Sequence, residues 1–322
     1  MGHGQRRQLY AFPGLPRAAV RLLSQEHHIA QNVTTAHPTV AASATGAAAQ
    51  GLPWRLADID FSRLEPDRVR GDDTLYFVLA TSALVEAATH HYASNLIEYY
   101  AGDAELAAWL RTYWQPEELQ HGAALRAYVE AVWPEFSWER AFGGFYPEYA
   151  AACTQEELEP SRALEMAARC VVEAGTSTLY QTLNTYATEP VLTEITALLK
   201  SDEVRHYSHF YDAYRRYCAA NGPPSRWRVA RALLRRVLEA FNDDGDIAFR
   251  HAWNGRYPER PSTPEDYKTF QTAMRERITP SLPVTMSTKM LLKPLALPPR
   301  LNGWAVSLVG GVVRFAAGKP AR

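Results

Sequence analysis

The chain has 322 residues, of which 47% are hydrophobic and 21% are charged. This composition is typical of a folded globular protein and excludes disorder along the whole chain. The 34 Lys and Arg residues balance 35 Asp and Glu residues, so the chain has no net positive charge with which to bind nucleic acid. We therefore expect no nucleic-acid partner.

The cysteines and the apolar segments indicate the compartment. Cys153, Cys170 and Cys218 have no paired spacing, which argues against a disulfide framework and a structural zinc site. Such cysteines are typical of a reducing, cytoplasmic environment. We expect no signal peptide, and the most apolar stretch, residues 304–313, is shorter than the ~20 residues that span a bilayer. A packed C-terminal segment is the favoured interpretation of that stretch, with a membrane-surface segment as the alternative.

The pattern divides the chain into three parts. Residues 1–52 are predicted to form a flexible arm, because residues 41–51 are nearly all Ala, Ser, Thr and Gly. Residues 53–241 are predicted to form a helical bundle. Residues 242–322, which are rich in Pro and turn residues, are predicted to be an extension that packs on the bundle.

Apolar residues that recur every three or four positions predict an all-α fold. The pattern indicates four long helices, at 74–101, 104–132, 161–188 and 190–220, with a long aromatic crossover over 133–160 between the second and the third. Such a pair of helix hairpins joined by one long connection is a known form of the four-helix bundle. Further helices are predicted at 226–241 and 264–277.

Two Glu-x-x-His motifs, Glu118 to His121 and Glu203 to His206, lie on the apolar faces of the second and fourth predicted helices. A spacing of three places the Glu and the His of each motif on one face of a helix. The other two helices each carry one Glu on the apolar stripe. These residues precede the motif glutamates by similar intervals, 32 and 30 residues, and they are Glu86 and Glu173.

Four carboxylates that meet in a dry interior require cations. Two divalent metal ions carry the four positive charges that would neutralise them. Oxygen and imidazole ligands favour iron or manganese over structural zinc. The predicted metal ligands are therefore Glu86, Glu118, His121, Glu173, Glu203 and His206.

Other acidic and histidine residues near these motifs are not interpreted as metal ligands. Glu98, Glu117 and Glu165 are expected on the surface. His90 lies one turn after Glu86, and we interpret it as a hydrogen-bonded helix histidine rather than a seventh ligand.

Over residues 74–217 the chain resembles the soluble ferritin-like di-iron carboxylate proteins, and among them the acyl-(acyl carrier protein) desaturases. The resemblance rests on Trp114-x-x-Glu117-Glu118-x-x-His121-Gly122, Glu173-x-x-Thr176 and Asp202-Glu203-x-Arg205-His206. It implies a ferritin-like bundle, a homodimer, and two iron ions or a manganese–iron pair. It also implies that Asp202 holds His121, that Trp114 lies on the electron-entry side, and that Thr176 assists oxygen or proton handling.

The chain departs from that family at some positions. Pro116 lies inside the second predicted helix and must kink it or start a new one. A radical tyrosine of the ribonucleotide reductase type is replaced by Leu125, and the extra histidine of di-iron N-oxygenases by Leu199. Thr176 stands where rubrerythrins have a further carboxylate. Iron storage fits poorly, because the chain is long for a minimal ferritin subunit.

These features predict an O2-activating di-iron oxidoreductase, of desaturase or hydroxylase type, that acts on a hydrophobic substrate and accepts electrons from a ferredoxin-type donor. A non-catalytic iron-binding or ferroxidase protein and a di-iron N-oxygenase are the alternatives. The helix at 226–241 either docks an acyl carrier protein, which would present the substrate, or is an ordinary solvated face. The docking arginines would be Arg228, Arg231 and Arg235.

Overall fold

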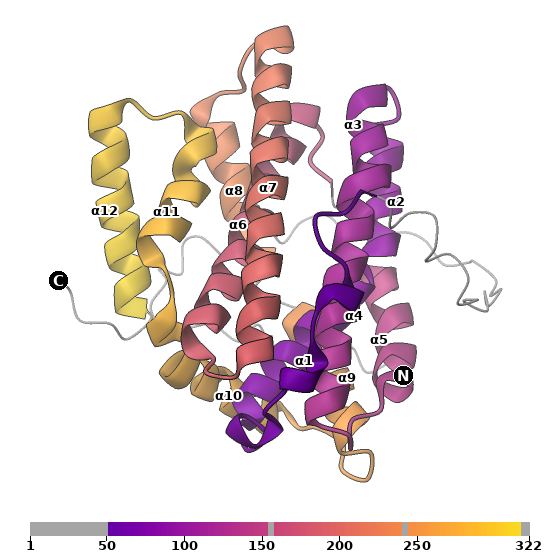
Figure 1. Cartoon of the computed structure of the whole chain (residues 1–322). Helices are drawn as coiled ribbons and strands as arrows, with labels where there is room; N and C mark the ends of the chain where they lie inside the picture. The colour runs from indigo at the N-terminus through magenta and orange to yellow at the C-terminus, as the bar shows by residue number, and fades with distance from the viewer. Residues whose placement is uncertain (1–50, 154–157, 240–243, 317–322) are drawn as a thin grey trace, which may run out of the picture. The chain divides into compact units, whose positions relative to one another are not determined.

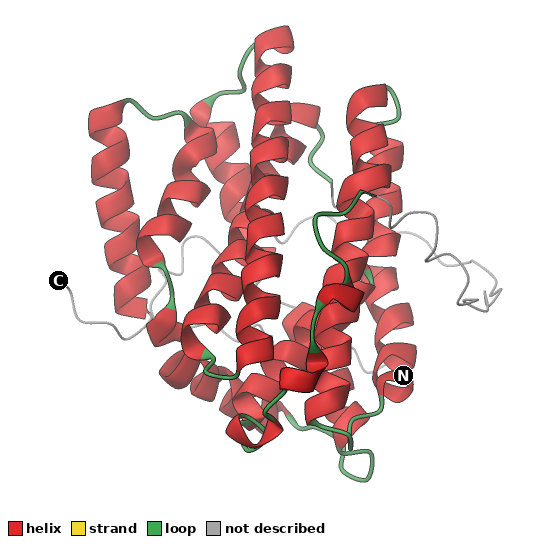
Figure 2. Cartoon of the chain, in the orientation of Figure 1, coloured by secondary structure: helices red, strands yellow, loops and turns green. Residues whose placement is uncertain are grey.

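A computed structural model describes residues 51–153, 158–239 and 244–316 (Figure 1). The chain divides into two units, residues 1–44 and 45–322, and every described residue belongs to the second. Within the described part all regular structure is helical and no strand occurs, as Figure 2 shows. The predicted all-α class is therefore confirmed. Nearly all of the predicted arm, residues 1–52, lies outside the described residues.

The first two predicted helices are each interrupted. The first consists of α1 (Asp73–Ala87) and α2 (Thr89–Tyr99), which meet at Ala88. The second consists of α3 (Ala104–Trp109), a π-helical turn over Leu110–Trp114, and α4 (Gln115–Val132). The sequence predicted a break at Pro116, and the wide turn provides it. A π turn removes the usual hydrogen bonds just where proline cannot donate one.

The third and fourth predicted helices are continuous. They are α6 (Arg162–Tyr186) and α7 (Pro190–Asn221), and they form an extensively packed hairpin. Glu189 caps α7, because its side chain accepts a hydrogen bond from the backbone N–H of Leu192 at 2.7 Å. Pro190 follows in the first turn, where its missing N–H costs nothing. The second extensive pair is α1 with α4, and α4 also contacts α7.

The rest of the described chain is more helical than predicted. The crossover contains α5 (Trp138–Ala152), and the expected fifth helix is α8 (Arg226–Glu239). The C-terminal quarter holds α9 (Asp244–Arg256), α10 (Pro264–Ala273), α11 (Val284–Leu292) and α12 (Pro299–Ala316), of which only α10 was anticipated. The helical pattern is weakened by Pro147 inside α5 and by Gly303, Gly310 and Gly311 inside α12. None of the described helices combines the length and the apolar character needed to cross a bilayer.

The core is built around the two hairpins, with the later helices beside them. Figure 1 shows α11 and α12 on one side of α6 and α7, and α4 with α2 on the other. The helix α5 packs on α9, α8 packs on α6, and α11 packs on α6.

Gly122 shows how closely α1 and α4 approach. A Cβ atom at this position would lie 2.6 Å from the backbone nitrogen of Ala87, so only glycine fits. The contact holds α4 against the break between α1 and α2, directly beside Glu86.

Candidate metal centre

The six predicted ligands come together in the interior. Glu86 comes from α1, Glu118 and His121 from α4, Glu173 from α6, and Glu203 and His206 from α7. Each is at most 5% exposed. The sequence placed these residues on the apolar stripes of four helices, and the helices bring them together.

Within this set, two groups of side chains could each hold a metal ion. One group is Glu86, Glu118, His121 and Glu203, and the other is Glu118, Glu173, Glu203 and His206; in each, the ligand atoms lie within 4.8 Å of one another. Glu118 and Glu203 belong to both groups. Two carboxylates would thus be shared between adjacent ions, and each ion would keep one Glu and one His of its own.

The outer nitrogen of each imidazole is held by a carboxylate from the other hairpin. His121 Nε2 lies 3.0 Å from Asp202 Oδ2, and His206 Nε2 lies 2.6 Å from Glu117 Oε2. Arg205 joins the two holders, with Nη1 at 2.7 Å from Asp202 and Nη2 at 3.1 Å from Glu117. An ionised carboxylate only accepts hydrogen bonds, so each Nε2 carries the proton and Nδ1 faces inward.

The inward atoms fit a pair of metal ions. His121 Nδ1 lies 3.2 Å from Glu203 Oε1, and His206 Nδ1 lies 3.0 Å from Glu118 Oε1. Among the described residues, both Nδ1 atoms and Glu203 Oε1 are buried without a hydrogen-bond partner. Buried polar atoms are normally satisfied, and a cation between them would satisfy all three. Carboxylate and imidazole donors suit iron, manganese or zinc, so the donor set fits a metal ion but does not distinguish between these metals.

The carboxyl groups repel one another in the metal-free protein. Burial and the neighbouring Glu118 and Glu203 raise the pKa of Glu86 well above its ordinary value. Burial, with the charge of Glu203, raises the pKa of Glu118, and burial raises the pKa of Glu173 to about 8. Burial also acts to raise the pKa of Glu203, but the two neighbouring imidazoles outweigh it and lower that pKa.

The pKa values of the two imidazoles are raised as well. Burial acts to lower the pKa of His121 and of His206, but the surrounding carboxylates outweigh it and hold both pKa values well above the ordinary value. Protons therefore accumulate where positive charge is lacking. A metal ion at the centre would displace them.

Two hydroxyl groups contact the carboxylates directly. Thr176, a predicted site residue, donates from Oγ1 to Glu203 Oε2 at 2.8 Å. Tyr180, two turns from Glu173 on α6, donates its buried hydroxyl to Glu86 Oε1. Glu86 and Glu203 thus have fixed orientations on both sides of the centre.

A tryptophan that the sequence did not single out, Trp54, lies beside Asp202. Trp114 is buried in a second core cluster, with its ring 5.7 Å from that of Tyr92 and 5.6 Å from that of Phe210. Trp54 instead donates from Nε1 to Asp202 Oδ2 at 2.8 Å and lies parallel to the His121 ring at 6.3 Å. It precedes the helices in a segment without periodicity, so the sequence pattern gave no signal for it.

Two glutamates that were expected on the surface are buried, and those predictions are wrong. Glu117 is 6% exposed because it holds His206, and Glu165 is fully buried because Arg169 Nε lies 2.8 Å from its Oε1. Glu98 is exposed, as predicted. His90 is also exposed and lies 2.9 Å from Gln115 Nε2, so it supplies no seventh ligand.

The predicted docking arginines do not share one environment. Arg228 and Arg231 are exposed on α8. Arg235 instead pairs with Glu159 at 3.0 Å and Glu239 at 3.3 Å, so its guanidinium is already engaged within the chain.

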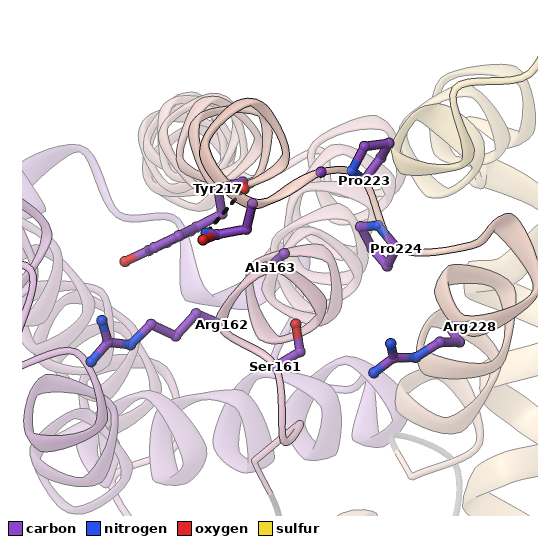
Figure 3. Close-up of a pocket in the computed structure, with 9 residues that line it drawn as sticks. Ser161, Arg162, Ala163, Tyr217, Pro223, Pro224 and Arg228 are labelled. Carbon is purple, nitrogen blue, oxygen red and sulfur yellow. Dashed lines mark hydrogen bonds between the residues drawn. The ribbon is translucent and has the colours of Figure 1, made fainter.

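A cavity of about 470 Å³ lies where α6 begins and α7 ends, lined by residues 161–163, 217 and 221–224 and by Arg228. Figure 3 shows Arg162 and Arg228 on either side of Ser161. None of the six carboxylate and imidazole residues lines it, so this cavity is separate from the candidate metal centre.

Comparison with protein-family models and with curated proteins finds no match for this chain.

Proposed function

We propose that this chain is a ferritin-like di-iron oxidoreductase that uses O2 to desaturate or hydroxylate a hydrophobic substrate. The observation that carries the proposal is the pair of buried ligand groups that share Glu118 and Glu203. A single structural metal ion needs one closed set of ligands. Two overlapping sets, each with an unshared Glu and His, suit two ions side by side.

The charge balance supports the same function. Four carboxylates and two neutral imidazoles carry four negative charges, which two divalent ions neutralise. Two ferrous ions, when bound, would donate electrons to O2, which is the oxidant for an unactivated C–H bond. A manganese–iron pair would satisfy the same ligands.

Residues of this chain would orient the ligands of the centre and would supply it with protons and electrons. Asp202 and Glu117 fix the two imidazoles so that both Nδ1 atoms point inward. Thr176 is placed to hold or pass a proton beside Glu203. Trp54, Asp202 and His121 form a continuous contact series to the centre from an indole that is 7% exposed, which suits electron delivery from a ferredoxin-type protein.

The helix order agrees with a ferritin-like bundle. The pairs α1–α4 and α6–α7 form two hairpins, and the connection between them contains α5. In that fold class, inward-facing Glu residues and Glu-x-x-His motifs build the metal site. We further propose a cytoplasmic homodimer, with the domain limits predicted from the sequence.

The decisive experiment is anaerobic reconstitution with Fe(II), followed by exposure to O2. We expect two iron ions per chain and, with an excess of reductant and a fatty acyl substrate, continuous O2 consumption with an altered substrate. A protein that binds two irons, oxidises them once and then stops would be an iron-binding protein. A protein that binds no iron would contradict the proposal.

The substrate carrier can be tested separately. We propose that an acidic acyl carrier protein docks at the exposed Arg228 and Arg231, while Arg235 remains engaged with Glu159. The R228E/R231E variant should lose turnover of the carrier-linked acyl chain and keep turnover of the free acid. Equal activity on both substrates would remove the docking surface and leave the metal centre unaffected.

A further inference from the structure

The helix α12 exposes a continuous apolar stripe. Its large hydrophobic side chains recur at three- and four-residue intervals, which places them on one face of the helix. They are Leu301, Trp304, Leu308 and Val312, with exposed fractions of 55%, 66%, 53% and 61%. Contiguous exposed apolar surface of this kind marks an interaction site.

The stripe is not simply the packing face of a loosely attached helix. The opposite side of α12 packs on α11, which packs in turn on α6. That side carries the half-buried Val306, Val309 and Val313 and the buried Gly310. Figure 1 shows α12 at the margin of the described unit, with α11 between it and α6. The helix therefore has one apolar face for the protein and another for a partner.

The charge of the C-terminal segment indicates which kind of partner suits the stripe. Residues 277–322 contain seven basic residues and no acidic residue, whereas residues 1–276 carry a net charge of −8. The seven are Arg277, Lys289, Lys293, Arg300, Arg314, Lys319 and Arg322. Arg277 pairs with Asp72 at 2.7 Å, which leaves six further basic residues in this segment. An apolar stripe within a basic segment is complementary to a surface that is both apolar and anionic.

The start of α8 adds to this region. Arg226 donates from its guanidinium to the carbonyl oxygen of Ala296 at 3.2 Å, so the first turn of α8 lies beside the segment that leads into α12. Trp227 in that turn is 78% exposed. Exposed tryptophan is enriched where proteins meet lipid headgroups.

We propose that α12 binds this protein to the surface of an anionic lipid bilayer. The helix has 18 residues and would lie in the plane of the membrane, with the stripe in the acyl–headgroup boundary and the basic residues among anionic headgroups. A second copy of the chain is a poorer occupant, because symmetric association through this face would bring two basic regions together. The inference does not depend on the metal centre.

The test is co-sedimentation of the full chain with vesicles. We expect binding to vesicles of phosphatidylcholine mixed with phosphatidylglycerol, little binding to phosphatidylcholine alone, and release in high salt. The W304S/L308S variant should bind about tenfold more weakly or worse, since each exposed side chain contributes buried apolar area. Both residues face solvent, so the fold should persist, as circular dichroism and metal content can verify.

The matched control is Y113S, which removes a 50% exposed aromatic side chain from the π turn before α4 and should leave vesicle binding unchanged. The proposal is overturned if the wild-type chain does not bind anionic vesicles, or if W304S/L308S binds as well as wild type. It is also overturned if W304S/L308S converts a dimer to a monomer in sizing experiments without any change in vesicle binding, because the stripe would then be a self-association surface.

Discussion

Two glutamates on α6, eight residues apart, are buried in opposite ways. Glu165 is fully buried, and the chain neutralises it: Arg169 Nε lies 2.8 Å away, Arg236 lies 3.6 Å away, and the backbone N–H of Glu159 donates to it at 2.7 Å. Glu173 is 1% exposed and sits among other carboxylates, with the imidazole of His206 at 3.5 Å.

The difference shows what each region is built for. A buried carboxylate that serves packing is matched with arginine from the same chain, since an uncompensated charge would be too costly. Within the described part of the chain, the carboxylates around Glu173 form no ion pair with arginine. Arg205 contacts the holders Asp202 and Glu117, and Arg169 pairs with Glu165. A bound metal ion could supply the positive charge that this region lacks.

Replacement of a shared carboxylate should have the largest effect. In Glu203→Gln, both ligand groups lose a charged member, so we expect most of the bound metal to disappear from both positions. Metal content and calorimetric titration with Fe(II) or Mn(II) would measure this. The Glu98→Gln variant, at an exposed glutamate of α2, is the matched control and should bind metal as the wild type does.

Removal of the structural glutamate should destabilise the fold instead. The Glu165→Ala variant leaves Arg169 buried and unpaired, which typically costs about 3–5 kcal/mol. Denaturant unfolding would measure the loss, and metal stoichiometry should remain unchanged. A variant as stable as wild type would show that the two regions do not differ in the way proposed.

A smaller effect is expected from the residues that hold the imidazoles. The Asp202→Asn variant keeps the size of the side chain and weakens the orientation of His121, so metal affinity should fall about 10- to 100-fold. Glu117→Gln should do the same through His206. Because Arg205 contacts both Asp202 and Glu117, each variant should weaken both ions; a loss confined to one position would show that the two positions are independent.

The smallest expected effect is that of pH on the stability of the metal-free protein. In the metal-free protein, raised carboxyl pKa values mean that the folded state keeps protons which the unfolded state releases. Stability should therefore fall as the pH rises from mildly acidic values through about 8, the pKa of Glu173. The raised imidazole pKa values act in the same direction. Thermal unfolding with a chelator should show a loss of a few degrees, and the metal-loaded protein should show none.

The sequence was sufficient to predict the features that helical periodicity determines. Helices with many turns place residues on faces, so the interior positions of Glu86, Glu173 and the two Glu-x-x-His motifs followed from spacing. The break near Pro116 followed from the chemistry of proline.

What the sequence could not supply depends on contacts between distant segments. Trp54 lies 148 residues before Asp202, and no local pattern marks that pair. Glu117 was placed on the surface because it lies beside the apolar stripe, yet it bonds to His206 across the bundle. The main partner of Glu165, Arg169, is one turn away on α6, but the pair is buried partly by α8, a later helix that also brings Arg236 to 3.6 Å from Glu165.

The double contact of Arg205 has a consequence for how the centre fills. The guanidinium of Arg205, which is 45% exposed, binds both carboxylates that orient the imidazoles. The two imidazoles are therefore held through the same arginine. Through Arg205, an ion that orients one imidazole would also hold the other imidazole in its orientation. Loading should consequently be cooperative, with half-filled chains scarce at any concentration of metal.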